Sequence, residues 1–306
     1  MAKTSRGLQP SAEPAPGRVP DAGVLRVAMA QIAPALANRE RNLAMHLEQI
    51  EAARRQDADL ITFPELSLTG YFVRDMVPEV AISPASADIR RLMEAAGKMA
   101  LVVGFVEESP QHRFYNTALY AEGGRIVHLH RKVYLPTYGL FDEQRYFAPG
   151  DRIQAFDTAR FGRVGLLICE DLWHLSAAAI MQAEEIDVLV CPVNSPARGV
   201  DGPVIRTAET YDQISTAYAQ LLGAVVIVVN RVGFEDGLCF WGGSQVVGPS
   251  GRIIAEAPML DEALAVATFD LTDLRRQRLI VPLARDERLL LTIEELNRIK
   301  RRRYET

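Results

Sequence analysis

The order of apolar segments and turn residues repeats once along the chain, and this repeat constrains the fold more than any other feature. Each half reads as strand, helix, strand, helix and strand, followed by a hairpin. In the first half, strands are predicted over 24–32, 58–63 and 101–106, helices over 38–50 and 87–99, and a hairpin over 117–121 and 125–129. In the second half, strands are predicted over 164–168, 188–193 and 224–229, helices over 177–183 and 206–222, and a hairpin over 244–247 and 252–256.

Cap and turn residues mark the ends of these segments. Asn38 is a typical helix N-cap, and Gly223 is placed to end the long helix of the second half. Gly123-Gly124 and Pro249-Ser250-Gly251 predict the two hairpin turns. Because both halves contain strands and helices in one order, the simplest packing puts two mixed sheets face to face with helices outside. We therefore expect a four-layer αββα sandwich, α/β in class, as a single domain over residues 24–270.

The two ends of the chain differ from this repeat. Residues 1–23 contain four prolines and no apolar stretch, which predicts a disordered leader rather than a signal peptide. Residues 271–306 are rich in charge and then helical over 289–303, which is typical of a solvated helix or an arm that contacts a neighbouring subunit. No apolar run approaches the roughly 18 to 20 residues of a membrane span.

Charge and cysteine content exclude several classes of function. The net charge is −5, with 34 basic and 39 acidic residues mixed along the chain, so neither a nucleic acid nor a membrane partner is expected. Three cysteines are too few for a disulfide framework, which favours a reducing cytoplasm. The composition thus favours chemistry on a small molecule.

Three polar residues follow predicted strands and could meet in one crevice. These are Glu65, Lys132 and Cys169. Taken singly, Glu65 could begin a helix, Cys169 could be a small core residue, and Lys132 could be a solvated surface base. Together they form a unit, because a thiol becomes a nucleophile when a base removes its proton and a cation favours the thiolate. Lys132 could also stabilise the oxyanion of a tetrahedral intermediate.

These residues lie in a series of separated motifs. The motifs are Phe63-Pro64-Glu65-Leu66, His130-Arg131-Lys132-Val133-Tyr134-Leu135, Cys169-Glu170-Asp171-Leu172-Trp173, Val229-Asn230-Arg231-Val232-Gly233, Trp241-Gly242-Gly243-Ser244 and Gly248-Pro249-Ser250-Gly251. In order and spacing they resemble the motifs of the nitrilase superfamily, over roughly residues 24–270. The resemblance implies the sandwich fold, a Cys169 nucleophile, a Glu65 base and a Lys132 oxyanion contact.

The resemblance also implies further site residues. Glu143 would be a second acid that orients Lys132 and the substrate, although it could instead be a loop residue paired with Arg145. Within the superfamily, the motifs look most like the glutaminase domain of glutamine-dependent NAD synthetase, without a glycine loop for ATP phosphates. The glutaminase resemblance adds four substrate-binding candidates, which are Tyr138, Glu170, Trp173 and Ser195.

The sequence leaves alternatives open on substrate and assembly. We expect a free-standing amidase that acts on a small polar amide, with neither cofactor nor metal, because no ligand set surrounds His174. The alternatives are a glutaminase subunit that supplies ammonia to a separate synthetase, a true nitrilase, or a non-catalytic binding protein. Glu170 could also pair with Arg198 and leave an apolar pocket near Trp173. A homo-oligomer, dimer or higher, is expected from the family.

Overall fold

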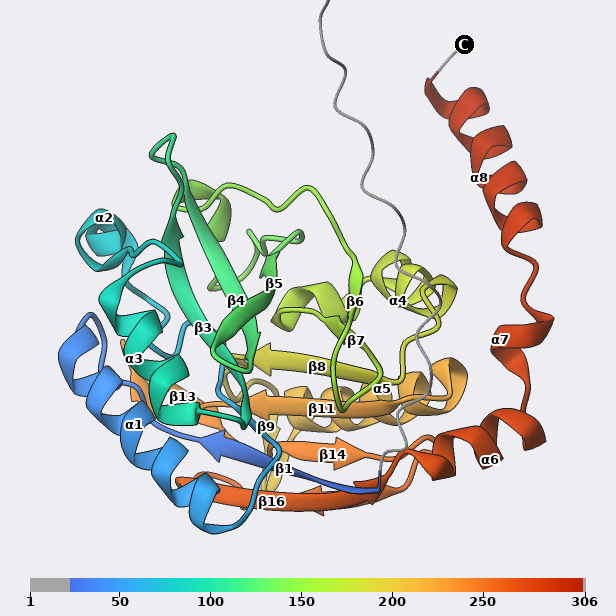
Figure 1. The fold of residues 1–306 in the computed structure, drawn as a ribbon. Coiled ribbons are helices and arrows are strands. Elements are labelled where there is room, and N and C mark those ends of the chain that lie inside the picture. The colour runs from blue at the N-terminus through green and yellow to red at the C-terminus, as the bar shows by residue number, and fades with distance from the viewer. Residues whose placement is uncertain (1–22, 305–306) are drawn as a thin grey trace, which may run out of the picture.

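The computed structural model describes residues 23–304 (Figure 1), and its first six-stranded sheet has the order β16-β1-β2-β3-β4-β5. Strands β1, β2 and β3 run parallel, whereas β4, β5 and β16 are antiparallel to their neighbours. The leader predicted over 1–23 lies, except for Gly23, outside the described residues. The bounds are β1 Val24–Gln31, β2 Leu60–Thr62, β3 Ala100–Glu108, β4 Phe114–Glu122, β5 Arg125–Arg131 and β16 Ala263–Asp270.

The second six-stranded sheet repeats this arrangement in the order β6-β7-β8-β11-β14-β15. Strands β7, β8 and β11 are parallel, and β6, β14 and β15 are antiparallel to their neighbours. The two sheets therefore match strand for strand, with β16 and β6 in equivalent places. The bounds are β6 Ala155–Asp157, β7 Arg163–Leu166, β8 Val188–Val193, β11 Val225–Asn230, β14 Gln245–Val247 and β15 Ile253–Glu256.

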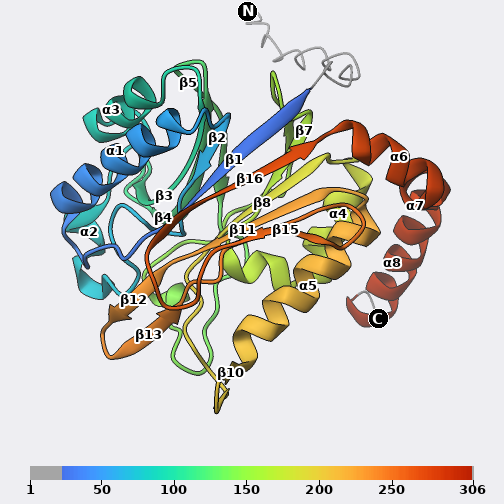
Figure 2. The same ribbon diagram turned by 90° about the horizontal axis from the view of Figure 1, so that it is seen from below.

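Alternation along β1 shows how the layers form. Leu25, Val27 and Met29 point into the core between the sheets, whereas Ala28 and Ala30 point toward helices α1 and α3. Figure 2 shows α1 and α3 on one side of the sheets and α4 and α5 on the other. The predicted four-layer αββα sandwich is thus confirmed. The bounds are α1 Arg39–Arg55, α3 Ala87–Ala96, α4 Leu175–Ala183 and α5 Arg206–Leu222.

Several predicted ends are confirmed, whereas the helix predicted over 38–50 continues to Arg55 and the helix predicted over 87–99 is shorter. Asn38 accepts a hydrogen bond from the backbone of Arg41 at 3.1 Å, and Gly223 ends α5 with φ +56°. The helix predicted over 87–99 ends at Ala96, because Gly97 takes a left-handed φ of +61°. Strands β6 and β16 were not predicted, and neither was the hairpin of β12 (Val232–Glu235) and β13 (Leu238–Trp241). The remaining short elements are η1 Arg74–Met76, α2 Val77–Val80, η2 Glu143–Arg145, η3 Cys169–Trp173, β9 Val200–Asp201 and β10 Val204–Ile205.

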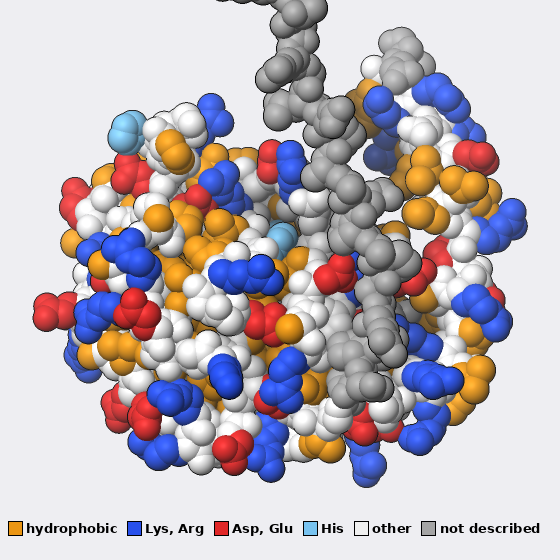
Figure 3. Space-filling view, viewed as in Figure 1, with side chains coloured by type: hydrophobic (Ala, Val, Ile, Leu, Met, Phe, Trp, Pro, Cys, Tyr) orange, Lys and Arg blue, Asp and Glu red, His pale blue; other side chains and the backbone are white. Residues whose placement is uncertain are grey.

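The C-terminal segment contains three helices that differ in packing. In α6, Leu274 is buried and Arg278 donates hydrogen bonds to the carbonyls of Gly223 at 3.1 Å and Ile186 at 2.6 Å. Most apolar side chains of α8 are exposed, Leu290 by 77%. Figure 3 shows apolar and basic side chains side by side on this last helix. None of the described helices is both long and apolar enough to cross a membrane. The bounds are α6 Thr272–Ile280, α7 Leu283–Asp286 and α8 Leu289–Tyr304.

Candidate active site

The ends of four strands bring the predicted polar residues into one buried region. Glu65 follows β2, Lys132 directly follows β5, and Cys169 follows β7. Asn194, which sequence reasoning missed, directly follows β8. Glu65, Lys132 and Asn194 are each 1% exposed. Lys132 is therefore not a solvated surface base, and Glu65 lies in a turn rather than in a helix.

Glu65 is held by hydrogen bonds on both carboxylate oxygens. Its Oε1 accepts from Lys132 Nζ at 2.7 Å and from Asn116 Nδ2 at 2.7 Å. Its Oε2 accepts from the backbone N–H of Asn194 at 2.9 Å, and the Asn194 side chain donates to the Glu65 carbonyl at 2.7 Å. The carboxylate therefore has one fixed orientation, set by three separate segments of the chain.

Lys132 lies between two carboxylates. Its Nζ also donates to Glu143 Oε1 at 2.7 Å, and that oxygen accepts a further hydrogen bond from Tyr71 Oη. Burial opposes the charge of Lys132, but Glu143 and Glu65 more than offset this and raise its pKa well above the ordinary value. Burial raises the pKa of Glu143 to about 7 against the pull of Lys132. Glu143 thus pairs with Lys132, and the alternative pairing with Arg145 is wrong.

Cys169 is the first residue of η3 and lies at the sharp turn that follows β7. Its φ is +46°, a left-handed conformation that a non-glycine residue adopts only when its surroundings enforce it. The thiol is buried, and Sγ lies 3.4 Å from Tyr211 Oη. Burial, followed by the charge of Glu65, raises the pKa of the Cys169 thiol, while Lys132 acts in the opposite direction. These surroundings therefore favour the neutral thiol over the thiolate.

Asp171 connects the segment of Lys132 to the segment of Cys169. Its Oδ1 accepts from the backbone N–H groups of Val133 at 3.0 Å and Tyr134 at 2.9 Å. Its Oδ2 bonds His130 Nε2 at 2.7 Å and the backbone N–H of Ile168 at 3.1 Å. Asp171 is fully buried, so these four contacts satisfy a carboxylate that would otherwise be costly to bury. This carboxylate fixes the distance between the two motifs.

Comparison with known proteins identifies the family of the chain. Residues 26–279 match the family model described as carbon-nitrogen hydrolase. The chain belongs to the carbon-nitrogen hydrolases. This hydrolase is 34% identical over 279 residues to an (R)-stereoselective amidase of a Pseudomonas species, a match that covers 89% of this chain and 94% of the amidase. The resemblance to the nitrilase superfamily is confirmed.

Other relatives of the hydrolase are longer proteins. It is 30% identical over 255 residues to the glutamine-dependent NAD(+) synthetase of Acinetobacter baylyi, which covers 83% of this chain and 46% of the synthetase. The chain thus spans about half the length of these curated relatives. Among solved structures, a mutant of the amidase from Nesterenkonia sp. AN1 is similar, with TM-score 0.75, 24% identity and coverage of 91% and 99% of the two chains. That amidase carries the acetamide moiety of fluoroacetamide covalently at its active-site cysteine.

Two of the four substrate-binding candidates of the hydrolase are in direct contact. Tyr138 Oη donates to both carboxylate oxygens of Glu170 at 3.0 Å, and burial raises the pKa of Glu170. His174 Nε2 is 3.7 Å from Glu170, whereas the alternative pairing of Glu170 with Arg198 does not occur. The side chain of Arg198 lies over the Phe141 ring instead, at 5.4 Å.

The other two candidates are placed by different contacts. The backbone N–H of Ser195 donates to Asn230 Oδ1 at 2.9 Å, which fixes the chain at the exit of β8. Trp173 is 38% exposed, and its ring meets the Tyr211 ring edge to face at 5.5 Å. The two residues therefore lie on the segments that follow β8 and Cys169, respectively.

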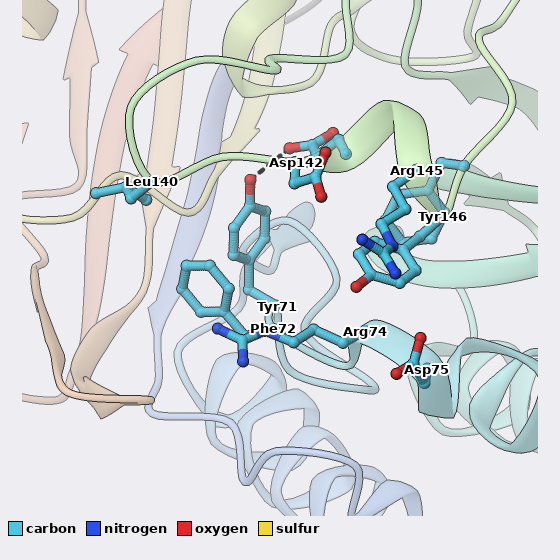
Figure 4. A pocket seen from close by; sticks show the side chains of 10 residues that line it. Tyr71, Phe72, Arg74, Asp75, Leu140, Asp142, Arg145 and Tyr146 are labelled. Atoms are coloured by element: carbon cyan, nitrogen blue, oxygen red, sulfur yellow. Dashed lines mark hydrogen bonds between the residues drawn. The ribbon is translucent and has the colours of Figure 1, made fainter.

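A cavity of about 390 Å³ borders Glu143, with Tyr71 among its lining residues (Figure 4). The dashed line in Figure 4 is the hydrogen bond from Tyr71 to Glu143. Glu143 Oε2 is buried and has no hydrogen-bond partner among the described residues. Within residues 23–304, no group of three or more His, Cys, Asp and Glu side chains is arranged to hold a metal ion.

Proposed function

We propose that this carbon-nitrogen hydrolase is an amidase that cleaves the non-peptide C–N bond of a small polar amide through a Cys169 thioester. One observation carries the proposal: the buried Lys132 ammonium is shared by Glu65 and Glu143 at 2.7 Å each, beside a buried thiol. Burying such a charge network costs free energy, and networks of this kind are concentrated at functional sites. This one contains a thiol, a carboxylate and an ammonium group, which are the groups that acyl transfer requires.

The proposed reaction has two half-reactions. Glu65 takes the proton of the Cys169 thiol, the sulfur electron pair attacks the carbonyl carbon, and Lys132 stabilises the oxyanion. The C–N bond then breaks, the leaving nitrogen takes the proton from Glu65, and ammonia departs from the thioester. In the second half, Glu65 removes a proton from water, the hydroxide attacks the thioester, and the C–S bond breaks to release the acid. Glu65 then returns its proton to the Cys169 sulfur, which restores the thiol.

Glu143 is proposed as the second acid that orients Lys132 and the substrate amide. Its Oε1 is taken by Lys132 and Tyr71, whereas Oε2 is buried without a partner among the described residues. Because a buried acceptor without a partner is unfavourable, an amide N–H of the substrate is a suitable donor for Oε2. Tyr138, Glu170, Trp173 and Ser195 are proposed to contact the acyl side.

The test of this proposal is turnover of a substrate panel by the wild type and Cys169→Ala. The panel contains amides, carbamoyl compounds and nitriles, with ammonia release as the readout. Cys169→Ala should lower turnover by about 10⁴-fold or more, because the nucleophile acts within a catalytic unit. A folded Cys169→Ala protein with near-normal activity would refute the mechanism. An acyl adduct located on Cys169 by mass spectrometry would support it.

A second function is favoured by the synthetase relatives. Several proteins that match this chain are glutamine-dependent NAD(+) synthetases. The match covers 42 to 46% of the length of four of these synthetases. The alternative is therefore a glutaminase subunit that passes ammonia to an ATP-dependent partner. Co-purification of such a partner, together with glutamine as the best substrate, would favour this alternative. A panel dominated by nitriles would favour a true nitrilase.

We also propose that the protein is a homo-oligomer in a reducing cytoplasm. The exposed apolar side chains of α8, including Leu289, Leu290, Ile293 and Leu296, need a surface to cover them. All three cysteines of the chain are free thiols, which fits a reducing compartment.

A further inference from the structure

A tyrosine on α5 contacts the sulfur at the centre of the site. Tyr211 is 1% exposed, and its Oη lies 3.4 Å from Cys169 Sγ, within the distance of a hydrogen bond to sulfur. No sequence motif includes this residue. We propose that the Tyr211 hydroxyl is a catalytic hydrogen-bond donor to the Cys169 sulfur, which stabilises the thiolate both before attack and when the thioester breaks. The proposal rests on Cys169 being the nucleophile of the proposed function.

The surroundings of Tyr211 leave its proton available to the sulfur. Burial raises the pKa of the phenol well above its ordinary value, and Cys169 Sγ lies within hydrogen-bond distance of the hydroxyl. A thiolate can only accept, so the phenol is the donor once Cys169 has lost its proton. The ring is held between Trp173, edge to face at 5.5 Å, and Trp241 at 6.0 Å. The phenol is thus fixed in position before a substrate arrives.

The charge balance around Cys169 shows why such a donor is useful. Burial and Glu65 raise the pKa of the thiol, while Lys132, Tyr211 and the backbone of Asn194 lower it. The phenol groups of Tyr71 and Tyr138 also interact electrostatically with Cys169. Lys132 is already shared by two carboxylates, so a neutral donor adds thiolate stabilisation without another buried charge.

Tyr211 is a donor throughout the cycle and not a base. Burial raises its pKa well above the ordinary value, so the phenol keeps its proton. When Glu65 removes the thiol proton, the Tyr211 O–H donates to the thiolate. When the tetrahedral intermediate of deacylation collapses, the C–S bond breaks and its electron pair returns to sulfur. The same O–H then donates a hydrogen bond to the thiolate that forms. The stabilisation therefore acts on the leaving group of the second half-reaction.

The test compares Tyr211→Phe with Tyr218→Phe in the full chain. Tyr218 is a matched control, because it lies two turns further along α5 and is also buried. The readouts are kcat and the pH dependence of iodoacetamide alkylation, followed on the Cys169 peptide by mass spectrometry. Tyr211→Phe should shift the alkylation profile of Cys169 to higher pH. It should also slow alkylation at neutral pH and kcat, each on the order of tenfold, the effect of one hydrogen bond to a charged group. Tyr218→Phe should match the wild type.

The outcomes separate this inference from the proposed function. Equal alkylation profiles and equal kcat for Tyr211→Phe and Tyr218→Phe overturn the role of Tyr211, even if Cys169→Ala is inactive. An active Cys169→Ala protein overturns the proposed function and the inference with it. If Tyr211→Phe does not fold, Trp173→Leu takes its place, since it removes the edge-to-face contact that holds the Tyr211 ring. Alkylation should then slow about threefold, and a rate equal to that of Tyr218→Phe overturns the inference.

Discussion

Asp171 bonds His130 Nε2 at 2.7 Å, and this contact joins β5 of the first half to the turn that carries Cys169 in the second. The same carboxylate accepts from the backbone on both sides of the contact. Lys132 and Cys169 come from different halves of the repeat, so Asp171 is the residue through which their relative position is set.

Replacing Asp171 by Asn should disturb this alignment. The Asn oxygen can still accept from Val133 and Tyr134, but its NH₂ group faces the donor N–H of Ile168. We expect kcat to fall about 10- to 100-fold with little change in KM, and stability to fall by about 3 kcal/mol, the scale of lost hydrogen bonds to a buried carboxylate. Kinetics and thermal unfolding measure both. The control is Asp212→Asn on α5, and unchanged kcat in Asp171→Asn would contradict the alignment role.

Glu143 should give the enzyme an acidic limit near neutral pH. As the pH falls through about 7, Glu143 gains a proton and its ion pair with Lys132 is lost, so kcat should fall. Glu143→Gln should lower kcat about 10- to 10³-fold, as for one oriented electrostatic contact, and should lack this limb. The pH–rate profiles of both proteins are the measurement. Parent-like kinetics in Glu143→Gln would remove the second-acid role.

The same shift predicts a pH dependence of stability. The folded-state pKa of about 7 lies above the ordinary value of 4.5, so the native state binds more protons between these pH values. The stabilisation from protonated Glu143 is therefore fully present below about 4.5 and is lost as the pH rises through about 7. Denaturant unfolding across this range should show a smaller slope in Glu143→Gln. Identical slopes for the wild type and Glu143→Gln would mean that a group other than Glu143 titrates in this range.

Substrate polarity should follow from Glu170 and Tyr138. A carboxylate with a phenol donor in a half-buried site favours a substrate that brings an amino group. We expect a glutamine-like amide to exceed its deamino analogue by about 10- to 100-fold in kcat/KM, and an aromatic nitrile to be poorer still. Glu170→Gln should shrink the difference between the two amides. If loss of the amino group costs nothing, or the nitrile is fastest, the polar site is wrong while Cys169 chemistry stands.

The last helix should contribute to assembly. A chain ending at Asp286 keeps α6, whose Leu274 and Arg278 pack on the body, and removes α8. Since burial stabilises by roughly 25 cal/mol per Å² of apolar surface, we expect a smaller oligomer by light scattering, with kcat retained. Replacing Leu289, Leu290 and Ile293 by Ser in the full chain should have the same effect. An unchanged mass in both would exclude α8 as the main contact.

Local signals predicted the parts of the fold that local chemistry determines. Gly123 and Gly124 take φ values of +59° and +74° at the predicted hairpin turn, and Gly223 ends α5 where expected. The turn between β12 and β13 contains Asp236-Gly237, a dipeptide that also favours a hairpin turn, but this hairpin was not predicted. By contrast, β16 is rich in alanine and pairs with a strand at the other end of the chain, so no local pattern indicated it.

Site residues that lie in sequence motifs could be predicted. Site residues that reach the site only through tertiary packing could not. Glu65, Lys132 and Cys169 could be found as polar residues at strand exits, and the same rule applied to β8 would have found Asn194. Tyr211 lies on the buried face of α5, where a tyrosine is typical of the core. Its contact with Cys169 depends on the tertiary packing of α5 against the second sheet.

The pairing of β16 with β1, in which Val24 faces Asp270, has a consequence for synthesis on the ribosome. The first half of the repeat emerges early, yet one side of β1 has no partner until nearly the whole chain has been translated. An apolar strand with an open edge is prone to pair with other chains, and contacts of such large sequence separation form slowly. We therefore expect nascent chains that stop before β16 to aggregate or to occupy chaperones, even when every residue of the first half is present.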